Sequence, residues 1–494
     1  MNRSIHDFSL NSILSVSKIN SKRTKMICTI GPASNTVETL QNLIKNGMTI
    51  ARLNFSHGDH ESHLKILNNV KQAIRLTRSE GRVGIMLDTK GPEIRTGYLE
   101  SGGKVDFIKG QILKITGDYN VKGNSEIIAL SYAKVVSVMK PGQKILIADG
   151  NLSLEVKEVD QVNNLLITTV LNAFSLGERK NVNLPGVKVD LPVITEKDHH
   201  DIVNFGVRHQ VDYVALSFSR SKHCIESCRK VLGTAGKDIQ IIPKIENEEG
   251  IVNIVEIIEA SDGLMMARGD LGMELNPSKL LIAQKYMTSH CRRLGKPVIC
   301  ATQMLESMTK NSRPTRAEMS DVGNAVLDSV DSVMLSGETG SGMFVLESAQ
   351  IMTGICREVE ASFNYKEYYK SMKKKLKKSG KISEKKALHI LSKSAVKLSF
   401  TLETNAIIVL DESGLLSRHI SKLRPNAFII SPNSNLSVLN KMTLCFGVVG
   451  IHSRPQNYIQ DSMDYIISNG LENKGSNVVL VNIVKNQIKL FELR

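Results

Sequence analysis

The stretch IQIIPKIENEEG, residues 239–250, is an apolar run that ends on a lysine and a glutamate two positions apart. In a β-strand, residues i and i+2 point to the same face, so Lys244 and Glu246 are expected to project side by side. An isolated pair of this kind is usually an ordinary ion pair at a strand end. Its meaning depends on the other apolar runs of the chain, because most of them also end on polar residues.

Eight such apolar runs occur in the chain, and most are separated by stretches with helical periodicity. Alternating strands and helices predict a parallel (β/α)8 barrel, or TIM barrel, in which both faces of each strand are buried. Residues 22–90 and 191–360 are expected to form this barrel. The runs cover residues 26–30, 49–55, 83–88, 211–218, 239–246, 263–268, 297–303 and 332–337, and the predicted helices include 36–46, 59–79, 221–232, 276–293 and 316–328.

An insertion interrupts the alternation after the third run. Residues 91–190 contain segments typical of hairpin strands separated by glycine turns, at 104–117, 144–159 and 165–177. The simplest interpretation is an all-β lid domain inserted after the third barrel strand.

A further series of apolar runs follows the barrel and predicts an open α/β domain over residues 361–494. This domain begins with a basic linker, because residues 366–386 contain ten lysines against two glutamates. Residues 1–21 are expected to form a loose N-terminal arm. Their apolar residues are interrupted too often for a signal peptide, and an organellar transit peptide is the alternative.

Composition and charge narrow the class of protein. The chain is 41% hydrophobic and 23% charged, and no apolar stretch approaches the roughly 18 residues of a membrane helix. The seven cysteines show no C-x-x-C pairing, which favours reduced thiols in a cytoplasmic protein. The net charge of +15 suggests nucleic-acid binding, but about eight of these charges lie in the arginine-free lysine stretch. That stretch is typical of a solvated linker or helix face, so we expect no nucleic-acid or membrane partner.

Polar and charged residues end seven of the eight predicted strands. Because catalytic groups in such barrels come from the carboxyl ends of the strands, these side chains are expected to converge on one rim. The residues are Arg52, Asn54, Ser56, His57, Asp88, Thr89, Lys90, Ser217, Lys244, Glu246, Arg268, Gly269, Asp270, Thr302, Gln303 and Ser336 to Thr339.

Two groups within this set are candidate cation sites. Glu246 and Asp270 offer carboxylate oxygens without a nearby His or Cys, which favours Mg²⁺ or Mn²⁺ over zinc. A second group holds one carboxylate and three neutral oxygen donors, which suits a monovalent cation; a hydrogen-bonded polar patch is the alternative. Its members are Asn54, Ser56, Asp88 and Thr89.

Positive charge surrounds the predicted divalent site. Arg52, Arg95 and Lys244 stand near it, together with the amides of ARGDLG (267–272), which is expected to be a tight glycine turn. A metal beside this much positive charge indicates a small polyanionic substrate. The predicted reaction is phosphoryl transfer or enolate chemistry.

Several long stretches resemble the pyruvate kinase family. They include TKMICTIGPAS (24–34), MTIARLNFSHG (48–58), SDGLMMARGDLGMEL (261–275) and GKPVICATQMLESM (295–308). The resemblance is almost continuous from about residue 22 to 360 and weaker beyond. Departures at Pro243, Gly323 and Met343–Phe344 remove no catalytic residue.

The resemblance implies phosphoryl transfer from phosphoenolpyruvate to ADP, giving pyruvate and ATP, by a cytoplasmic homotetramer that requires Mg²⁺ (or Mn²⁺) and K⁺. It implies that Lys244, Arg52 and Thr302 are catalytic, with Lys244 stabilising charge on the transferred group and Thr302 serving the proton step through water. Glu93 matches the K⁺-dependent members. The other implied roles are substrate contacts from Arg52, Lys244, Ala267, Gly269, Asp270 and Thr302; nucleotide contacts from Arg52, Asn54, His57, Arg95 and Lys180; Mg²⁺ ligands Glu246 and Asp270; and K⁺ ligands Asn54, Ser56, Asp88 and the Thr89 carbonyl.

The sequence also allows two other functions and several modes of regulation. A lyase or aldolase with a Mg²⁺-enolate barrel would share the divalent site, and a basic scaffold for RNA or membranes would use only the lysine stretch. In the C-terminal domain, the loop 411–417 corresponds to the family's effector loop, but Asp411 and Glu412 would repel a phosphate. The chain also has no tryptophan, so activation by fructose 1,6-bisphosphate is not expected. Another sugar phosphate, a nucleotide or no effector would fit.

Overall fold

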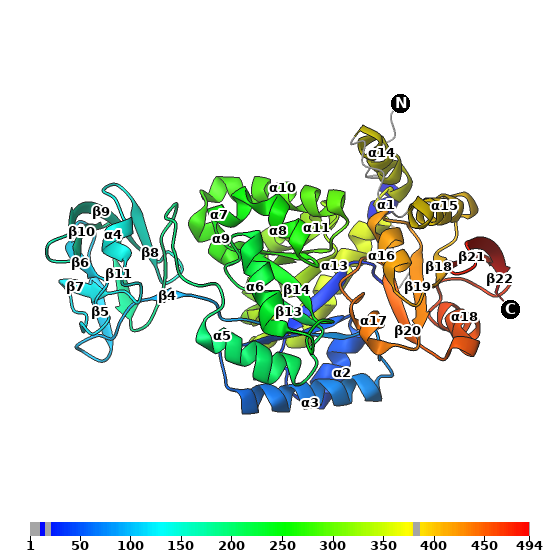
Figure 1. Cartoon of the computed structure of the whole chain (residues 1–494), viewed down its shortest axis with the longest axis horizontal. Helices are drawn as coiled ribbons and strands as arrows, with labels where there is room; N and C mark the ends of the chain where they lie inside the picture. The colour runs from blue at the N-terminus through cyan, green and yellow to red at the C-terminus, as the bar shows by residue number, and fades with distance from the viewer. Residues whose placement is uncertain (1–9, 15–20, 379–385, 494) are drawn as a thin grey trace.

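Three domains lie in a row in the computed structural model of this chain, which describes residues 10–14, 21–378 and 386–493 (Figure 1). The barrel lies in the centre, the β-rich domain projects from one end, and the C-terminal α/β domain packs at the other. Most of the predicted N-terminal arm lies outside the described residues, apart from α1 (Leu10–Leu14). Residues 379–385 of the lysine stretch also lie outside them.

Eight parallel strands close the central barrel, which confirms the predicted fold class. β3 is hydrogen-bonded directly to β13, so the segment between them is an insertion into the barrel. Each strand overlaps one of the predicted apolar runs. The strands are β1 (Lys25–Thr29), β2 (Ile50–Asn54), β3 (Gly84–Asp88), β13 (Tyr213–Leu216), β14 (Gln240–Ile245), β15 (Leu264–Ala267), β16 (Val298–Ala301) and β17 (Ser332–Leu335), in the closed order β1-β17-β16-β15-β14-β13-β3-β2.

Most residues of these strands are apolar because both faces of each strand are buried. Ile27 and Ile50 belong to the cluster that fills the barrel interior, whereas Met26 and Cys28 belong to the larger cluster under the surrounding helices. Leu444 of the C-terminal domain joins the interior cluster, and the Tyr213 hydroxyl donates to the Asn440 carbonyl at 2.7 Å. The C-terminal domain therefore closes the amino end of the barrel and leaves the carboxyl ends for the functional site.

Helices surround the barrel where periodicity predicted them and also at further places. The five predicted helices are α2 (Val37–Lys45), α3 (His60–Leu76), α6 (Lys222–Leu232), α10 (Leu280–Leu294, preceded by the 3-10 turn Pro277–Lys279) and α11 (Arg316–Leu327). The additional helices are α5 (Glu196–Asp201), which continues into the π-helix η1 (Ile202–Val207), α7 (Glu248–Val252), α8 (Ile254–Ala260), α9 (Arg268–Glu274), η3 (Glu306–Thr309), α12 (Gly337–Gly340) and α13 (Val345–Ala361).

The lid is rich in β-structure, as predicted, but its strand pairing is only partly local. Residues 144–159 form the antiparallel hairpin of β8 and β9. In 104–117 and 165–177, by contrast, the two strands join different sheets, because β5 pairs with β11 and β6 with β10. The elements are β4 (Ile94–Arg95), β5 (Lys104–Phe107), β6 (Ile112–Thr116), β7 (Ile127–Ala129), α4 (Val135–Val138), β8 (Lys144–Ile147), β9 (Leu152–Asp160), β10 (Leu165–Val170), β11 (Phe174–Gly177) and β12 (Asn181–Asn183).

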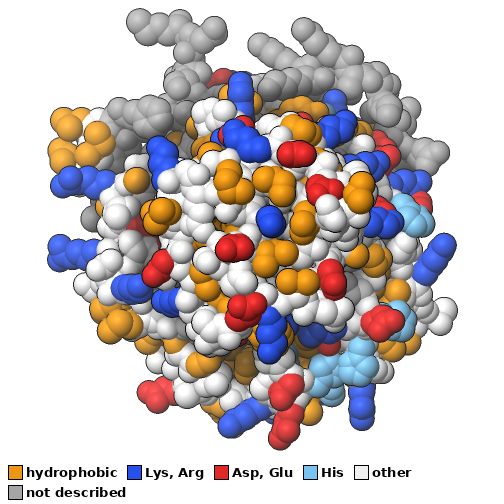
Figure 2. Space-filling view, turned by 90° about the vertical axis from the view of Figure 1, so that its left-hand side faces the viewer, with side chains coloured by type: hydrophobic (Ala, Val, Ile, Leu, Met, Phe, Trp, Pro, Cys, Tyr) orange, Lys and Arg blue, Asp and Glu red, His pale blue; other side chains and the backbone are white. Residues whose placement is uncertain are grey.

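Seen from the lid end, the surface mixes basic, acidic and apolar side chains, and several histidines gather near its lower edge (Figure 2). No helix among the described residues combines the length and apolar character needed to span a bilayer.

The C-terminal domain has the predicted open α/β architecture. Its strand order is β20-β19-β18-β21-β22, and only β22 runs antiparallel to its neighbour. Buried Arg424 ties this domain to the barrel, since its guanidinium lies 3.0 Å from Asp331. The elements are α14 (Tyr365–Lys378), α15 (Lys386–Leu402), β18 (Ala406–Leu410), α16 (Leu415–Lys422), β19 (Phe428–Asn433), α17 (Leu436–Asn440), β20 (Val448–His452), α18 (Tyr458–Ser468), β21 (Asn477–Asn482) and β22 (Gln487–Glu492).

Candidate functional site

Lys244, at the carboxyl end of β14, lies in the middle of a buried polar cluster. Its Nζ is 3.1 Å from Asp88 Oδ1 and 3.0 Å from Glu246 Oε1, and it donates to Ser217 Oγ at 2.8 Å. Burial alone would lower the pKa of Lys244, but the charges of Asp88 and Glu246 outweigh burial and raise it. The ammonium therefore stays charged at neutral pH, which suits an electrostatic role better than proton donation.

Asp88 connects this lysine to a second cation. Arg52 Nε donates to Asp88 Oδ2 at 2.6 Å, and Arg52 Nη1 donates to Thr29 Oγ1 at 2.8 Å. Burial would raise the pKa of Asp88, but Arg52 and Lys244 together lower it below its ordinary value. Asp88 is thus an ionised carboxylate that orients two cations at the carboxyl ends of β2 and β14.

Glu246 and Asp270 lie on the lid side of this cluster. Glu246 is 1% exposed and accepts the Phe218 amide at 2.5 Å, whereas Asp270 lies in the first turn of α9. Both line a cleft of about 400 Å³ between the barrel and the segment that returns from the lid. Burial and the nearby Glu246 charge raise the pKa of Asp270 to about 7, against the opposing effect of Lys244. A hard divalent cation would relieve this repulsion, so the donor set fits Mg²⁺ or Mn²⁺.

The ARGDLG stretch is the start of a helix and not the glycine turn expected from its sequence. The segment after Ala267 continues directly into α9, and Arg268 is its first residue. The Arg268 guanidinium contacts Asp321 at 2.6 Å and donates to the Thr302 carbonyl at 2.9 Å. The sequence around Asp321 did not predict this ion pair, because the pair joins two segments that are distant in the chain.

Gly269, in the first turn of α9, lies against Thr302, which directly follows β16. Thr302 has a positive φ of 74°, a backbone conformation that residues other than glycine rarely adopt. Residues in such conformations cluster at functional sites. A Cβ on Gly269 would lie only 2.8 Å from Thr302 Cγ2. The glycine therefore lets the α9 backbone approach the threonine closely.

The second predicted cation group lies on neighbouring strand ends. Asn54 is paired with Asp88 in the register of β2 and β3, and Asn54 Oδ1 accepts the Ser56 amide at 3.2 Å. The Thr89 carbonyl accepts Ser217 Oγ at 2.6 Å. Ser217 thus links this group to Lys244, a role that its position at a strand end did not reveal.

The predicted nucleotide contacts are divided between the barrel and the lid. His57 is exposed in the loop between β2 and α3, near Arg52 and Asn54 in sequence. Arg95 lies on the lid, where it contacts Glu93 Oε2 at 2.5 Å and the Arg179 carbonyl at 2.9 Å. Lys180 is exposed on the same lid surface, and its amide donates to Thr96 Oγ1.

Glu274, at the end of α9, holds the segment returning from the lid. It forms hydrogen bonds with Asn183 and with the backbone of Leu184 and Gly186, and burial raises its pKa to about 7. This contact was not predicted, because nothing in the local sequence indicates that the two segments meet.

Fold and site together define a class: a (β/α)8 barrel enzyme with a β-rich lid and a cluster of cations and carboxylates suited to small anionic substrates. Sequence models of the pyruvate kinase barrel domain and of the pyruvate kinase alpha/beta domain match residues 21–349 and 389–489. The chain belongs to the pyruvate kinase family. It is therefore a phosphotransferase of glycolysis that moves the phosphoryl group of phosphoenolpyruvate to ADP and forms pyruvate and ATP.

Individual relatives agree with this assignment over nearly the whole chain. The chain is 43% identical over 470 residues to pyruvate kinase from Eimeria tenella, which covers 94% of this chain and 87% of the relative. It is 46% identical over 409 residues to a cytosolic isozyme from Glycine max, covering 83% of this chain and 79% of the relative. A crystal structure of a pyruvate kinase from Cryptosporidium parvum superposes with a TM-score of 0.92 at 42% identity, over 99% of this chain and 100% of that one. The lyase, aldolase and scaffold alternatives are therefore rejected.

Proposed function

We propose that Lys244 is the principal charge-stabilising group of this kinase, with Glu246 and Asp270 as the ligands of a Mg²⁺ or Mn²⁺ ion. The observation that supports this most directly is the Lys244 ammonium held between the carboxylates of Asp88 and Glu246, at 3.1 and 3.0 Å. When bound, the metal would neutralise charge on phosphoryl and enolate oxygens. The protein has little covalent work to do in phosphoryl transfer, so positioning and positive charge dominate.

Some of the remaining substrate contacts would act through charge and others through the shape of the site. Arg52 would bind a phosphoryl oxygen while Asp88 fixes the direction of its guanidinium. Ala267 and Gly269 would supply a close backbone surface, because Gly269 has no side chain to block it. Thr302, strained at positive φ, would deliver a proton to the enolate through water.

A K⁺ ion would bind Asn54, Ser56, Asp88 and the Thr89 carbonyl. One carboxylate and three neutral oxygens give the low charge that suits a monovalent ion, and the register of β2 with β3 supports their proximity. Glu93 would keep the enzyme K⁺-dependent. Its contact with Arg95 supports a position beside the nucleotide phosphates.

The nucleotide would bind between Asn54, His57 and the lid residues Arg95 and Lys180. Because the latter two belong to a domain that projects from the barrel, lid closure would bring them to the phosphates and exclude water (Figure 1). Water excluded in this way cannot intercept the phosphoryl group.

We also propose that the enzyme works in the cytoplasm as a homotetramer without nucleic-acid or membrane partners. Relatives from Glycine max and Solanum tuberosum are named cytosolic isozymes, which supports the compartment. Sedimentation equilibrium at several concentrations would test the tetramer.

Activation by fructose 1,6-bisphosphate is not proposed, because the chain's own carboxylate fills the start of α16. Asp411 accepts the Leu416 amide at 2.6 Å and the Ser413 hydroxyl at 2.7 Å, and the Ser417 hydroxyl donates to Ser431. A titration showing strong activation by the bisphosphate would contradict this.

A steady-state assay of pyruvate formation from phosphoenolpyruvate and ADP tests the cofactor requirements. Activity should require Mg²⁺ or Mn²⁺ and should fall when K⁺ is replaced by a large organic cation. Full activity without K⁺ would reject the assignment of the second cation site.

A further inference from the structure

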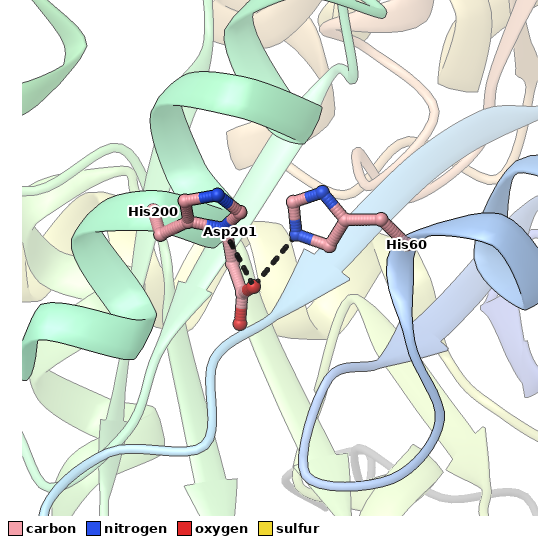
Figure 3. Close-up of side chains that lie close together, drawn as sticks. All are labelled: His60, His200 and Asp201. Atoms are coloured by element: carbon pink, nitrogen blue, oxygen red, sulfur yellow. Dashed lines mark hydrogen bonds and ion pairs between the residues drawn. The ribbon is translucent and has the colours of Figure 1, made fainter.

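Three side chains that commonly bind metals converge where α3 meets α5, and none belongs to the catalytic cluster (Figure 3). His60 begins α3, whereas His200 and Asp201 end α5. One ligand atom from each lies within 4.8 Å of the others, and this is the one such His/Cys/Asp/Glu group among the described residues. His60 Nε2 lies 2.8 Å and His200 Nδ1 4.0 Å from the same carboxylate oxygen, Oδ1 of Asp201.

The carboxylate is the fixed member of this group. Asp201 has a side chain only 3% exposed, and its other oxygen, Oδ2, accepts Lys197 Nζ at 2.5 Å. Lys197 Nζ in turn donates to the Phe55 carbonyl at 2.9 Å. Asp201 therefore presents Oδ1 toward the histidines while its second oxygen stays anchored.

The two imidazoles differ in freedom. The His60 ring is 33% exposed and lies edge-on to Phe55 and Phe205, with centroid distances of 5.9 and 5.6 Å. The His200 side chain is 61% exposed, with its ring centroid 4.7 Å from that of His60. Solvent can thus reach the site, and the His200 ring is free enough to adjust its distance to Oδ1.

The helix geometry at this point is unusual. α5 ends at Asp201, where the chain passes into the π-helix η1. π-helical segments are rare and occur often at functional sites. The exposed His200 and the buried Asp201 are adjacent in sequence at this transition, and Figure 3 shows both beside His60.

We propose that His60, His200 and Asp201 bind one Zn²⁺ ion, or a chemically similar late transition metal, with water completing the coordination. Two imidazole nitrogens and one carboxylate favour such metals over Mg²⁺, in contrast to the all-oxygen pair of Glu246 and Asp270. Ligand bonds of about 2.0–2.2 Å place neighbouring tetrahedral ligands about 3.4 Å apart. His200 Nδ1, at 4.0 Å from Oδ1, must therefore approach it by about 0.6 Å, and His60 Nε2, at 2.8 Å, must move away from it by about as much. The Lys197 ammonium lowers the affinity by repulsion but leaves Oδ1 available.

The ion would join two segments that border the active site. α3 begins just after the loop that carries His57, and α5 is the first helix after the lid. His63 Nε2 also lies 2.8 Å from the His57 carbonyl, which ties the loop to α3. Bound metal would therefore restrain the loop between β2 and α3 against the segment returning from the lid. This inference does not depend on the roles proposed for the catalytic residues.

Zn²⁺ titration of the full-length chain in excess Mg²⁺ tests the proposal, with binding followed by calorimetry and by the thermal midpoint. The variants are His200→Gln and His60→Gln, and the matched control is His199→Gln, an exposed histidine on the same helix that lies outside the group. Wild type and His199→Gln should bind one equivalent and gain thermal stability. Loss of an outer-sphere partner typically lowers metal affinity roughly 10–100-fold. Because they lose a direct ligand, the two ligand variants should lose more Zn²⁺ affinity than that.

Two results would overturn the site. One is a wild-type chain that binds no Zn²⁺ in excess Mg²⁺, and the other is a His200→Gln variant that binds Zn²⁺ as tightly as wild type. Should His60→Gln fail to fold, His200→Gln decides alone, because its side chain is exposed. Cobalt absorption provides a separate readout: bands of nitrogen-ligated Co²⁺ should appear in wild type and disappear in His200→Gln.

Discussion

Replacing Lys244 with methionine should lower kcat roughly a thousandfold and leave phosphoenolpyruvate binding largely intact. Methionine keeps most of the side-chain volume but removes the ammonium that lies about 3 Å from both Asp88 and Glu246. A cation about 4 Å from a phosphoryl oxygen contributes about 4 kcal/mol at an effective dielectric constant of about 20. At about 1.4 kcal/mol per factor of ten, that energy corresponds to about three orders of magnitude in rate.

The assay is steady-state pyruvate formation at saturating ADP and Mg²⁺, with kcat and KM for phosphoenolpyruvate fitted separately. Lys222→Met is the matched control, because Lys222 is a surface lysine of α6. Within the described part of the chain, its one ion pair is with Glu226, at 3.1 Å. It should retain wild-type kcat. A Lys244→Met enzyme within tenfold of wild type, or one whose loss lies entirely in KM, would refute the reasoning.

Three further substitutions test other parts of the structure. Gly269→Ala should lower kcat by about 100-fold without unfolding the protein, since its Cβ would displace Thr302; unchanged kinetics would argue against this close approach. Glu274→Gln should stabilise the protein above pH 7 and change its stability little near pH 4.5. A carboxyl whose pKa is raised from 4.5 to about 7 by folding costs stability as the pH rises through that interval. Thermal midpoints with the same pH dependence as wild type would contradict this. Gly323→Ala should raise the free energy of unfolding by about 0.5–1 kcal/mol, because a methyl group there would lie 3.5 Å from Val359 Cγ2; a lower denaturation midpoint would show that the helix has no room.

The barrel could be predicted from the sequence because its signal is local. Strands buried on both faces give continuous apolar runs, and closure of the barrel brings their carboxyl ends together. The i, i+2 rule also predicted Lys244 beside Glu246, and the structure places their charged atoms 3.0 Å apart. Asp88 and Arg52 were predicted to lie in the site because each is at the carboxyl end of a barrel strand.

The parts that escaped prediction depend on contacts between distant segments. Alternation identified the lid strands but not their partners, since pairing is set by register and by the rest of the sheet. The helix α9 was missed because its two glycines suggested a turn, whereas Arg268 is fixed by Asp321, 53 residues away. Ser217 and Glu274 likewise take their roles from segments that only the fold brings near.

Mn²⁺ binding followed by electron paramagnetic resonance tests most directly whether Glu246 and Asp270 hold a single divalent ion beside Lys244. We predict one tightly bound Mn²⁺ per wild-type chain, loss of that ion in both Glu246→Gln and Asp270→Asn, and its retention in Lys244→Met. Wild-type affinity for Mn²⁺ in either carboxylate variant would contradict the account.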